Sequence, residues 1–207
     1  MPASRLLVLG THNRKKGLEL AELLAPHGFV LRTLADFPEA ITVVEDGDSF
    51  AANAELKATR QARHLKKWVL GEDSGLVVDA LDGAPGIRSA RFAADDASDE
   101  ANNRHLLEEL DDTPPEARTA HYVCHMTLAD PQGGVRADYE SYCHGRIRLA
   151  PAGTAGFGYD PLFEIVEYHH TFGELGGAVK AMISHRARAM RMLVPQLMAL
   201  AGAGDWG

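Results

Sequence analysis

The sequence is poor in cysteine and in long apolar runs. Two of its 207 residues are cysteines, Cys124 and Cys143, and their spacing forms neither a CxxC motif nor a disulfide framework. No run of about 18 apolar residues occurs, so no transmembrane helix is expected. The N-terminus also lacks the apolar core and cleavage site of a signal peptide. These absences predict a cytoplasmic protein that has reduced thiols and no membrane partner.

Positive charge is also scarce. The 21 Lys and Arg residues against 29 Asp and Glu give a net charge of −8 with neutral histidine, and no basic run stands out. This balance argues against a nucleic-acid partner, although a polyanion could still bind where a few cations converge or a metal screens the charge. The length fits one large domain or two lobes over residues 1–207, with enough apolar residues for a core. Its last residues, 202–207, are expected to fray.

Two adjacent acids stand out in the hexapeptide Gly71–Leu76. Glu72 and Asp73 lie between two short apolar runs that are typical of strands. A carboxylate in such a place loses hydration and needs a cation or hydrogen-bond donors. We therefore interpret the hexapeptide as an acidic loop at strand ends, able to hold a divalent metal through oxygen ligands. The alternative is a surface turn that carries two solvated acids.

The first strand is predicted over residues 5–10, and a polar loop follows it. That loop is Thr11-His12-Asn13-Arg14-Lys15-Lys16, and leucines spaced as on one helix face come next. A strand, a polar loop and a helix start present backbone N–H groups to an anion. The glycine spacing and the Gly-Lys-Ser/Thr ending of a Walker A motif are absent. Plain helix capping by Thr11 or Asn13, with exposed lysines, is the alternative.

A second helix is predicted to start after Ser49, a good N-cap residue. Asn53 and Lys57 are four residues apart and therefore share one of its faces. That face either meets solvent or turns into a cleft. Glu45, just upstream, could supply a second metal carboxylate beside Asp73.

Two long strands, residues 119–128 and 135–149, flank the turn Asp130–Gly134 and predict a hairpin. A register that is symmetric about this turn would place Cys124 opposite Cys143. We expect packed, reduced thiols there rather than a cross-strand disulfide. The histidines show no coherent metal-ligand pattern.

Glycine and aromatic residues alternate near the C-terminal third of the chain, in residues 153–163. Three glycines around two aromatic rings and Asp160 suggest a loop that presents a ring such as Phe157 to a flat ligand, for example a base. An ordinary turn with core aromatics is the alternative. The last helix begins near Ser184, and cations in its first turn oppose the helix dipole, which favours a ligand contact.

Together these segments resemble the inosine triphosphate pyrophosphatase family, also called dITP/XTP pyrophosphatases. They occur in the family's order and spacing over nearly the whole chain. The resemblance implies hydrolysis of ITP, dITP and XTP to the monophosphate and pyrophosphate, with Mg²⁺ (magnesium) as cofactor and a homodimer as the assembly. It also implies two lobes around an active-site cleft, while the element order itself supports an α/β fold with a central mixed β-sheet and flanking helices. The segments are Thr11-x-Asn13-x-x-Lys16, Glu45–Lys57, Glu72–Arg91, Gly156–Phe163 and Ser184–Arg186.

The resemblance also assigns roles to particular residues. Asp73 matches the proton acceptor, and Glu45 and Asp73 match the acids associated with Mg²⁺. The remaining matches bind substrate: the phosphate loop Thr11, His12, Asn13, Arg14, Lys15 and Lys16; the further phosphate contacts Lys57 and Ser74; the nucleoside segment Phe157, Gly158, Tyr159 and Asp160; and the base-reading residues Lys180, His185 and Arg186.

The chain departs from the family pattern at several points. Gly71-Glu72 stands where many members have Ala-Asp, Ala155 where a third glycine is common, and Arg88 where an aromatic or aliphatic residue is usual. Residues 176–179, Gly-Gly-Ala-Val, replace a more acidic run before Lys180. This last change bears on the mobility and selectivity of the base pocket more than on the chemistry.

The expected mechanism follows from charge. Mg²⁺, Lys16, Lys57 and backbone N–H groups would neutralise the triphosphate, and Asp73 would hold or deprotonate a water that attacks, most simply, the α-phosphorus. Donors from Lys180, Arg186 or the backbone would select the 6-oxo group of the purine. The rival functions are a pyrophosphatase for pyrimidine or methylated nucleotides and a non-catalytic nucleotide-binding regulator.

Overall fold

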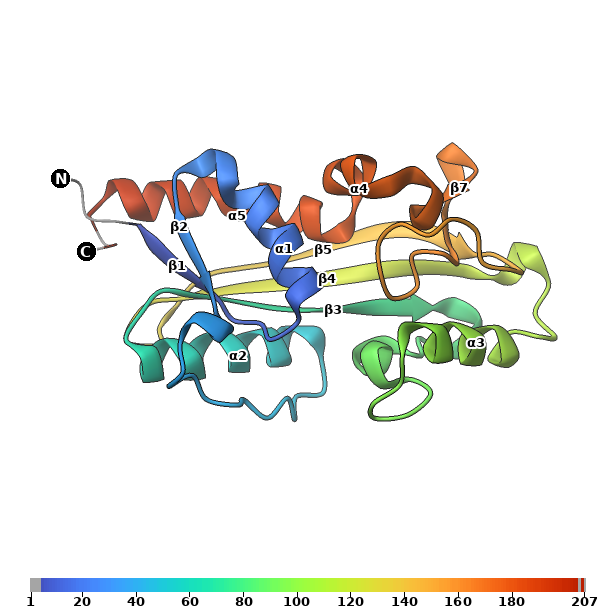
Figure 1. Cartoon of the computed structure of the whole chain (residues 1–207), viewed down its shortest axis with the longest axis horizontal. Coiled ribbons are helices and arrows are strands. Elements are labelled where there is room, and N and C mark those ends of the chain that lie inside the picture. Colours follow the sequence, from blue (N-terminus) through green and yellow to red (C-terminus); the bar gives the residue numbers. More distant parts are fainter. Residues whose placement is uncertain (1–4, 205, 207) are drawn as a thin grey trace. The chain divides into compact units, whose positions relative to one another are not determined.

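The computed structural model describes residues 5–204 and residue 206, and it confirms an α/β fold built on a mixed sheet (Figure 1). Seven strands pair in the order β2-β1-β3-β4-β5-β6-β7. β1 pairs in parallel with β2 and β3, whereas β6 pairs antiparallel with β5 and β7. The strands are β1 Leu6–Leu9, β2 Val30–Thr33, β3 Val69–Val78, β4 Thr119–Ala129, β5 Val135–Ile147, β6 Phe163–Ile165 and β7 His170–Thr171; the α-helices are α1 Arg14–Leu24, α2 Phe50–Leu65, α3 Asp99–Glu109, α4 Phe172–Ile183 and α5 His185–Gly202.

The described chain divides into two compact units. Unit 1 takes the chain up to Asp73, then Cys124–Ser141, then the chain from Arg186 onward; unit 2 takes Ser74–Val123 and Tyr142–His185. The division therefore falls directly after Asp73, within strand β3. Among the described residues, no helix is long and apolar enough to cross a membrane.

Unit 1 buries apolar side chains on both faces of its strands, as strands covered by helices on both sides do. α1 and α5 lie on one side of β1, and α2 lies on the other (Figure 1). Because successive side chains of a strand point to opposite faces, Leu7 and Leu9 pack with α1 and α5, while Val8 packs with α2. Leu70 and Val69 of β3 divide in the same way. The same alternation continues along β3, so Glu72 and Asp73 point to opposite faces of the sheet.

Unit 2 has a core of its own. Leu76 and Val78 of β3 pack there with Leu106 and Leu110 at the end of α3, and with buried aromatic rings. Phe163 stacks on Phe172 at a centroid distance of 5.7 Å. Tyr159, Leu162 and Phe163 of the Gly-rich segment thus belong to the core of unit 2.

The acidic hexapeptide is not a loop, which corrects the sequence prediction. Gly71–Leu76 lies inside β3, a continuous strand of ten residues. Glu72 and Asp73 are almost fully buried, with 1% and 8% of their surface exposed. The local pattern suggested a loop because buried carboxylates are costly unless they are paired. The partners come from helices that are distant in the sequence.

The expectation that residues 202–207 fray is wrong at Trp206. Its ring stacks on Trp68, with centroids 4.3 Å apart and planes 5° from parallel, and its Nε1 donates to the carbonyl oxygen of Leu6 at 2.9 Å. Helix α5 continues to Gly202. Residues 205 and 207 lie outside the described part of the chain. Both cysteines are free, so the expectation of reduced thiols is confirmed.

Helix α4 was not predicted from the sequence. Thr171 Oγ1 caps it by accepting from the Glu174 N–H, and the Glu174 carboxylate accepts from the Thr171 N–H, which is the Thr-x-x-Glu capping box that the sequence contains. Gly176 interrupts the helix with φ 75° and ψ 175°, a backbone conformation that is essentially limited to glycine. Glycine is a poor helix former, so the pair at residues 176 and 177 did not indicate a helix in the sequence.

Candidate active site

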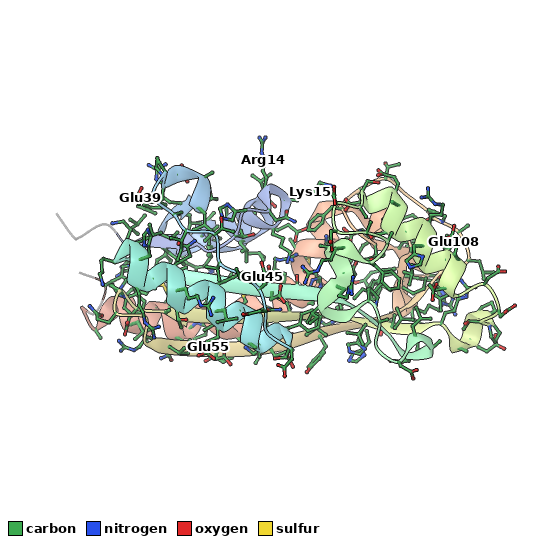
Figure 2. All side chains as sticks on the ribbon, turned by 90° about the horizontal axis from the view of Figure 1, so that it is seen from below. Arg14, Lys15, Glu39, Glu45, Glu55 and Glu108 are labelled. Atoms are coloured by element: carbon green, nitrogen blue, oxygen red, sulfur yellow. The ribbon has the colours of Figure 1, made fainter. Side chains whose placement is uncertain are left out.

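Asp73 is held by helix α2. The Lys57 ammonium lies 2.9 Å from Asp73 Oδ1 and 3.0 Å from Glu45 Oε2, and Asn53 Nδ2 donates to Asp73 Oδ2 at 3.4 Å. Asn53 is 1% exposed and Lys57 is 9% exposed. The shared face of Asn53 and Lys57 therefore turns toward β3 and not toward solvent. Glu45 belongs to the loop that precedes α2 (Figure 2).

The electrostatics of this group leave Lys57 charged. Burial alone would lower the pKa of Lys57, but the Asp73 and Glu45 carboxylates outweigh it and raise the pKa above its ordinary value. Burial raises the pKa of Asp73, and the neighbouring Lys57 and Lys16 ammonium groups oppose this only in part. Asp73 is thereby a stronger base than an exposed aspartate, which suits a group that must accept a proton from water.

The two carboxylates already face a cation. The Lys57 ammonium pairs with both Glu45 and Asp73, so two carboxylates share one cation and their charge is not fully neutralised by it. Mg²⁺ usually takes only one or two protein carboxylates and completes its shell with phosphate oxygens and water. In the described chain, no group of three or more His, Cys, Asp or Glu side chains is arranged to hold a metal. The residues present fit a magnesium ion that is shared with a phosphate substrate.

Glu72 points to the opposite face of the sheet and has a separate set of partners. Its Oε2 lies 3.1 Å from Lys16 Nζ, and its Oε1 accepts a hydrogen bond from Arg186 Nη2 at 2.9 Å. Arg186 Nη1 also forms an ion pair with Glu19 of α1. The Cys124 thiol donates to Glu72 Oε1 at 3.5 Å, and burial together with this carboxylate raises the pKa of Cys124. From the sequence, Glu72 was expected only as one of two acids in a loop able to hold a metal, and no individual role was assigned to it.

The polar loop at residues 11–16 forms the start of α1. The Asn13 side chain caps the helix by accepting from the Lys16 N–H at 3.1 Å, and Thr11 Oγ1 accepts from the Asn13 N–H at 3.1 Å. The capping interpretation of this loop is thus confirmed, and it leaves the phosphate-binding prediction open. His12, Arg14 and Lys15 are exposed, and Arg14 projects away from the fold (Figure 2). Of the six residues, Lys16 has its ammonium group directed at the acids of β3.

Gly71 explains how α2 comes close enough for Lys57 to reach Asp73. A Cβ atom at Gly71 would lie 2.7 Å from the Ala58 backbone nitrogen and still closer to the Ala54 carbonyl oxygen. The helix backbone therefore rests directly against β3. Ala at this position, which is common in the family pattern, does not fit this packing.

Replacing Gly71 with alanine is expected to lower the free energy of unfolding by about 1–3 kcal/mol, as overpacking does. It should also lower the activity, because α2 must move away from Asp73. Urea unfolding and initial rates measure the two effects. Gly202→Ala is the control, since a Cβ there meets nothing within 4 Å; a Gly71→Ala protein as stable as this control would contradict the packing argument.

In unit 2, the Gly-rich loop and helix α4 bring three predicted residues together. The Lys180 ammonium lies 2.5 Å from Asp160 Oδ2 and 4.3 Å from the centroid of the Phe157 ring. Asp160 Oδ2 also accepts from the Phe157 N–H at 2.8 Å. Asp160 and Lys180 are 1% and 5% exposed, whereas Phe157 is only partly buried. A buried ion pair therefore fixes the loop and places a cation against the face of an aromatic ring.

The neighbours of this loop hold it in place. The Tyr159 hydroxyl donates to the Ser89 carbonyl oxygen at 2.9 Å, and the Gly158 carbonyl oxygen accepts from Asn103 Nδ2 at 3.0 Å. Burial raises the pKa of Tyr159 well above its ordinary value, so it stays a neutral donor. Tyr159 is thus a core residue, as the alternative interpretation of the Gly-rich loop expected, while Phe157 is not fully buried.

The remaining predicted residues are His185 and Ser74 in unit 2 and Arg186 in unit 1. His185 is 3% exposed and its ring stacks on Tyr122, with centroids 4.6 Å apart. Ser74 follows Asp73 in β3 and is partly buried. Arg186, expected to read the base, has both terminal nitrogens engaged by Glu72 and Glu19. Its role toward a ligand stays a prediction.

The sequence and the fold were then compared with known proteins. The model of the Ham1 family matches residues 7–196. The chain belongs to the Ham1 family. This result confirms the resemblance drawn from the sequence segments.

Relatives in the Ham1 family carry a specific name. The chain is 55% identical to the dITP/XTP pyrophosphatase of Rhodopirellula baltica over 94% of this chain and 93% of that protein. It is 46% identical to the dITP/XTP pyrophosphatase of Geobacillus kaustophilus, over 95% and 96% of the two chains. Among solved structures, the HAM1 protein of Coxiella burnetii superposes with a TM-score of 0.85 at 31% identity, covering 94% of this chain and 98% of that one.

Proposed function

We propose that this protein hydrolyses deaminated purine nucleoside triphosphates, namely XTP, dITP and ITP, to the monophosphate and pyrophosphate. The observation that carries the proposal is the buried Asp73 carboxylate, which is held by Lys57 and has a raised pKa. A group of this kind can accept a proton from an attacking water. The names of the relatives in the Ham1 family support the substrate class.

In the proposed reaction, a water oxygen attacks the α-phosphorus of the nucleotide. Asp73 takes a proton from that water as the new P–O bond forms. The bond between the α-phosphorus and the oxygen that bridges to the β-phosphorus breaks, and pyrophosphate leaves with the bonding electrons. Lys16 and Lys57 neutralise phosphate oxygens, which supports a reaction whose rate depends mainly on positioning and charge.

The proposed cofactor is Mg²⁺, held by Glu45 and Asp73. When bound, it would neutralise and orient the phosphate oxygens. We also propose a homodimer in the cytoplasm, as the family resemblance implies. Light scattering coupled to gel filtration tests the oligomeric state.

We assign the selection of the base to Lys180. Hypoxanthine and xanthine carry an acceptor oxygen at the purine 6-position, whereas adenine carries an amino donor there. The Lys180 ammonium lies over the Phe157 ring and pairs with Asp160, so it would have to turn from that carboxylate to donate to a purine that stacks on the ring. Adenine would set donor against donor and leave buried polar groups unpaired, at a cost of about 1–3 kcal/mol per group. Guanine shares the 6-oxo group, so its rejection requires a second contact at the 2-amino group.

The raised pKa of Asp73 predicts the acidic side of the pH profile. Asp73 acts as a base only when it is deprotonated, so kcat/KM should fall as the pH drops through its pKa. Burial raises that pKa above the ordinary value of 3.8, whereas a bound cation favours the charged carboxylate, so the fall should begin at a higher pH at low Mg²⁺ than at saturating Mg²⁺. The residual activity of Asp73→Asn provides the control, since its profile reports only titration of the substrate. Identical profiles for the two proteins would contradict the role of Asp73 as the base.

The experiment that tests the function is pyrophosphate release from ITP, XTP, dITP, ATP and GTP, with and without Mg²⁺. Fast magnesium-dependent release from the first three, with slow release from ATP and GTP, is the expected result. Equal rates on all five nucleotides would be consistent with the proposed hydrolysis but would contradict the assignment of base selection to Lys180. Faster turnover of pyrimidine or methylated nucleotides would move the protein to that substrate class. Binding without turnover would indicate a regulator.

A further inference from the structure

Glu72 is a buried carboxylate that the proposed mechanism does not use. It lies beside Asp73 in β3, and because adjacent strand residues point to opposite faces, the two acids meet different helices. Asp73 meets α2 through Lys57, whereas Glu72 meets Lys16 of α1 and Arg186 of α5. Glu72 is 1% exposed. A carboxylate so deeply buried is retained only with cations to balance it.

Two cations lie against Glu72 within unit 1. Glu72 pairs with Lys16 and Arg186, and Arg186 also pairs with Glu19. The Arg186 side chain is 2% exposed, and its planar guanidinium bridges both acids, which gives it little freedom to move. The Lys16 side chain is 17% exposed. Lys16 is thus the more accessible of the two cations, and the one better placed to meet a phosphate.

A lysine ammonium is a point charge on a flexible stem, and nothing in its own geometry fixes its direction. Here Arg186 pairs with Glu72, and Glu72 in turn pairs with the Lys16 ammonium at 3.1 Å. Glu72 is the residue directly before Asp73 in β3. The Asn13 cap fixes the backbone of Lys16 at the other end of the side chain. The Lys16 ammonium is therefore paired with Glu72 before any substrate arrives.

We propose that Glu72 is a positioning residue that directs Lys16 toward the triphosphate. It does not touch the reacting atoms; it acts through Lys16 and depends on Arg186 for its own position. The inference rests on the proposed function. It also gives the adjacent acids of β3 separate tasks, with Asp73 in the chemistry and Glu72 in the placement of a phosphate-binding cation.

The test is a double-mutant cycle on pyrophosphate release from ITP with Mg²⁺, using Glu72→Gln, Lys16→Ala and the double variant. Glu72→Gln alone should lower kcat/KM by about 10–100-fold, the scale of a small misplacement of a substrate-positioning group. In the Lys16→Ala background, Glu72→Gln should lower kcat/KM by less than about twofold, because Glu72 acts through Lys16. Two independent sites would instead each show their full effect in the double variant. Glu22→Gln, an exposed acid of α1, is the matched control and should retain the wild-type rate.

Glu72→Asp keeps the charge and shortens the side chain, so it should restore part of the activity that Glu72→Gln loses. It also replaces Glu72→Gln in the cycle if circular dichroism shows that the glutamine variant does not fold. Losses that add fully in the double variant, or wild-type activity in Glu72→Gln, would overturn the positioning role. An inactive wild-type protein would instead overturn the proposed function, so the two failures are distinguishable.

Discussion

Asp73→Asn is expected to lower kcat by about 10²–10⁴-fold, the usual contribution of a positioned general base. Asparagine keeps the shape of the side chain and can still accept a hydrogen bond from Lys57, but it cannot take a proton from water. Asp73 is the acid whose carboxylate is buried next to Lys57 and Asn53 on the α2 side of the strand. Initial rates of pyrophosphate release from ITP at saturating Mg²⁺ measure the loss.

Two controls make this result specific. Asp112→Asn removes an exposed carboxylate of unit 2 and should leave the rate unchanged. Far-ultraviolet circular dichroism should show the same helix content for Asp73→Asn as for the wild type. A folded Asp73→Asn protein that retains full activity would mean that another group deprotonates the water.

The site could be predicted from the sequence where it depends on spacing within one element. Asn53 and Lys57 lie four residues apart, and the helix brings both to one face, as the structure has it. Ser49 was predicted as a cap, and Asn13 was one of two residues in the capping alternative, because such side chains act on a backbone only three residues away. These relations are local, so the sequence contains all the information that they need.

The interpretation of Gly71–Leu76 as a loop was wrong because the partners that stabilise this strand segment come from distant parts of the sequence. A strand with two adjacent acids is costly unless each finds a cation, and those cations are Lys57 from α2, Lys16 from α1 and Arg186 from α5. Nothing in the hexapeptide indicates that helices from three parts of the chain converge on it. Alternation along the strand then separates the two acids, which a loop would not do.

Trp206 shows the same limit at the end of the chain. A short segment with three glycines in residues 202–207 has the composition of a flexible tail. Its stability depends on Trp68 and Phe29, which precede it by more than a hundred residues. Composition alone therefore predicted fraying where tertiary packing provides order.

Trp206→Ala is expected to lower the free energy of unfolding by about 3–5 kcal/mol, the range for loss of a large aromatic side chain from a core. The ring is 8% exposed, stacks on Trp68, and lies 5.2 Å from the Phe29 ring by centroids. Its Nε1 also bonds the Leu6 carbonyl oxygen, at the start of β1. Urea unfolding measures the change, and Leu18→Ala, which truncates a side chain that is 57% exposed, should have little effect.

The two tryptophans of the chain also provide a direct signal for this contact. Because Trp68 and Trp206 are stacked, their coupled transitions should give a near-ultraviolet circular dichroism band that disappears in Trp206→Ala. Trp206→Phe should restore part of the stability, since it refills most of the volume, but it should restore neither the tryptophan–tryptophan band nor the hydrogen bond to Leu6. A stability change within about 0.5 kcal/mol for Trp206→Ala, as surface positions give, would mean that the tail is frayed after all. The loss of both the stability and the circular dichroism band in Trp206→Ala would establish that Trp206 closes the core of unit 1.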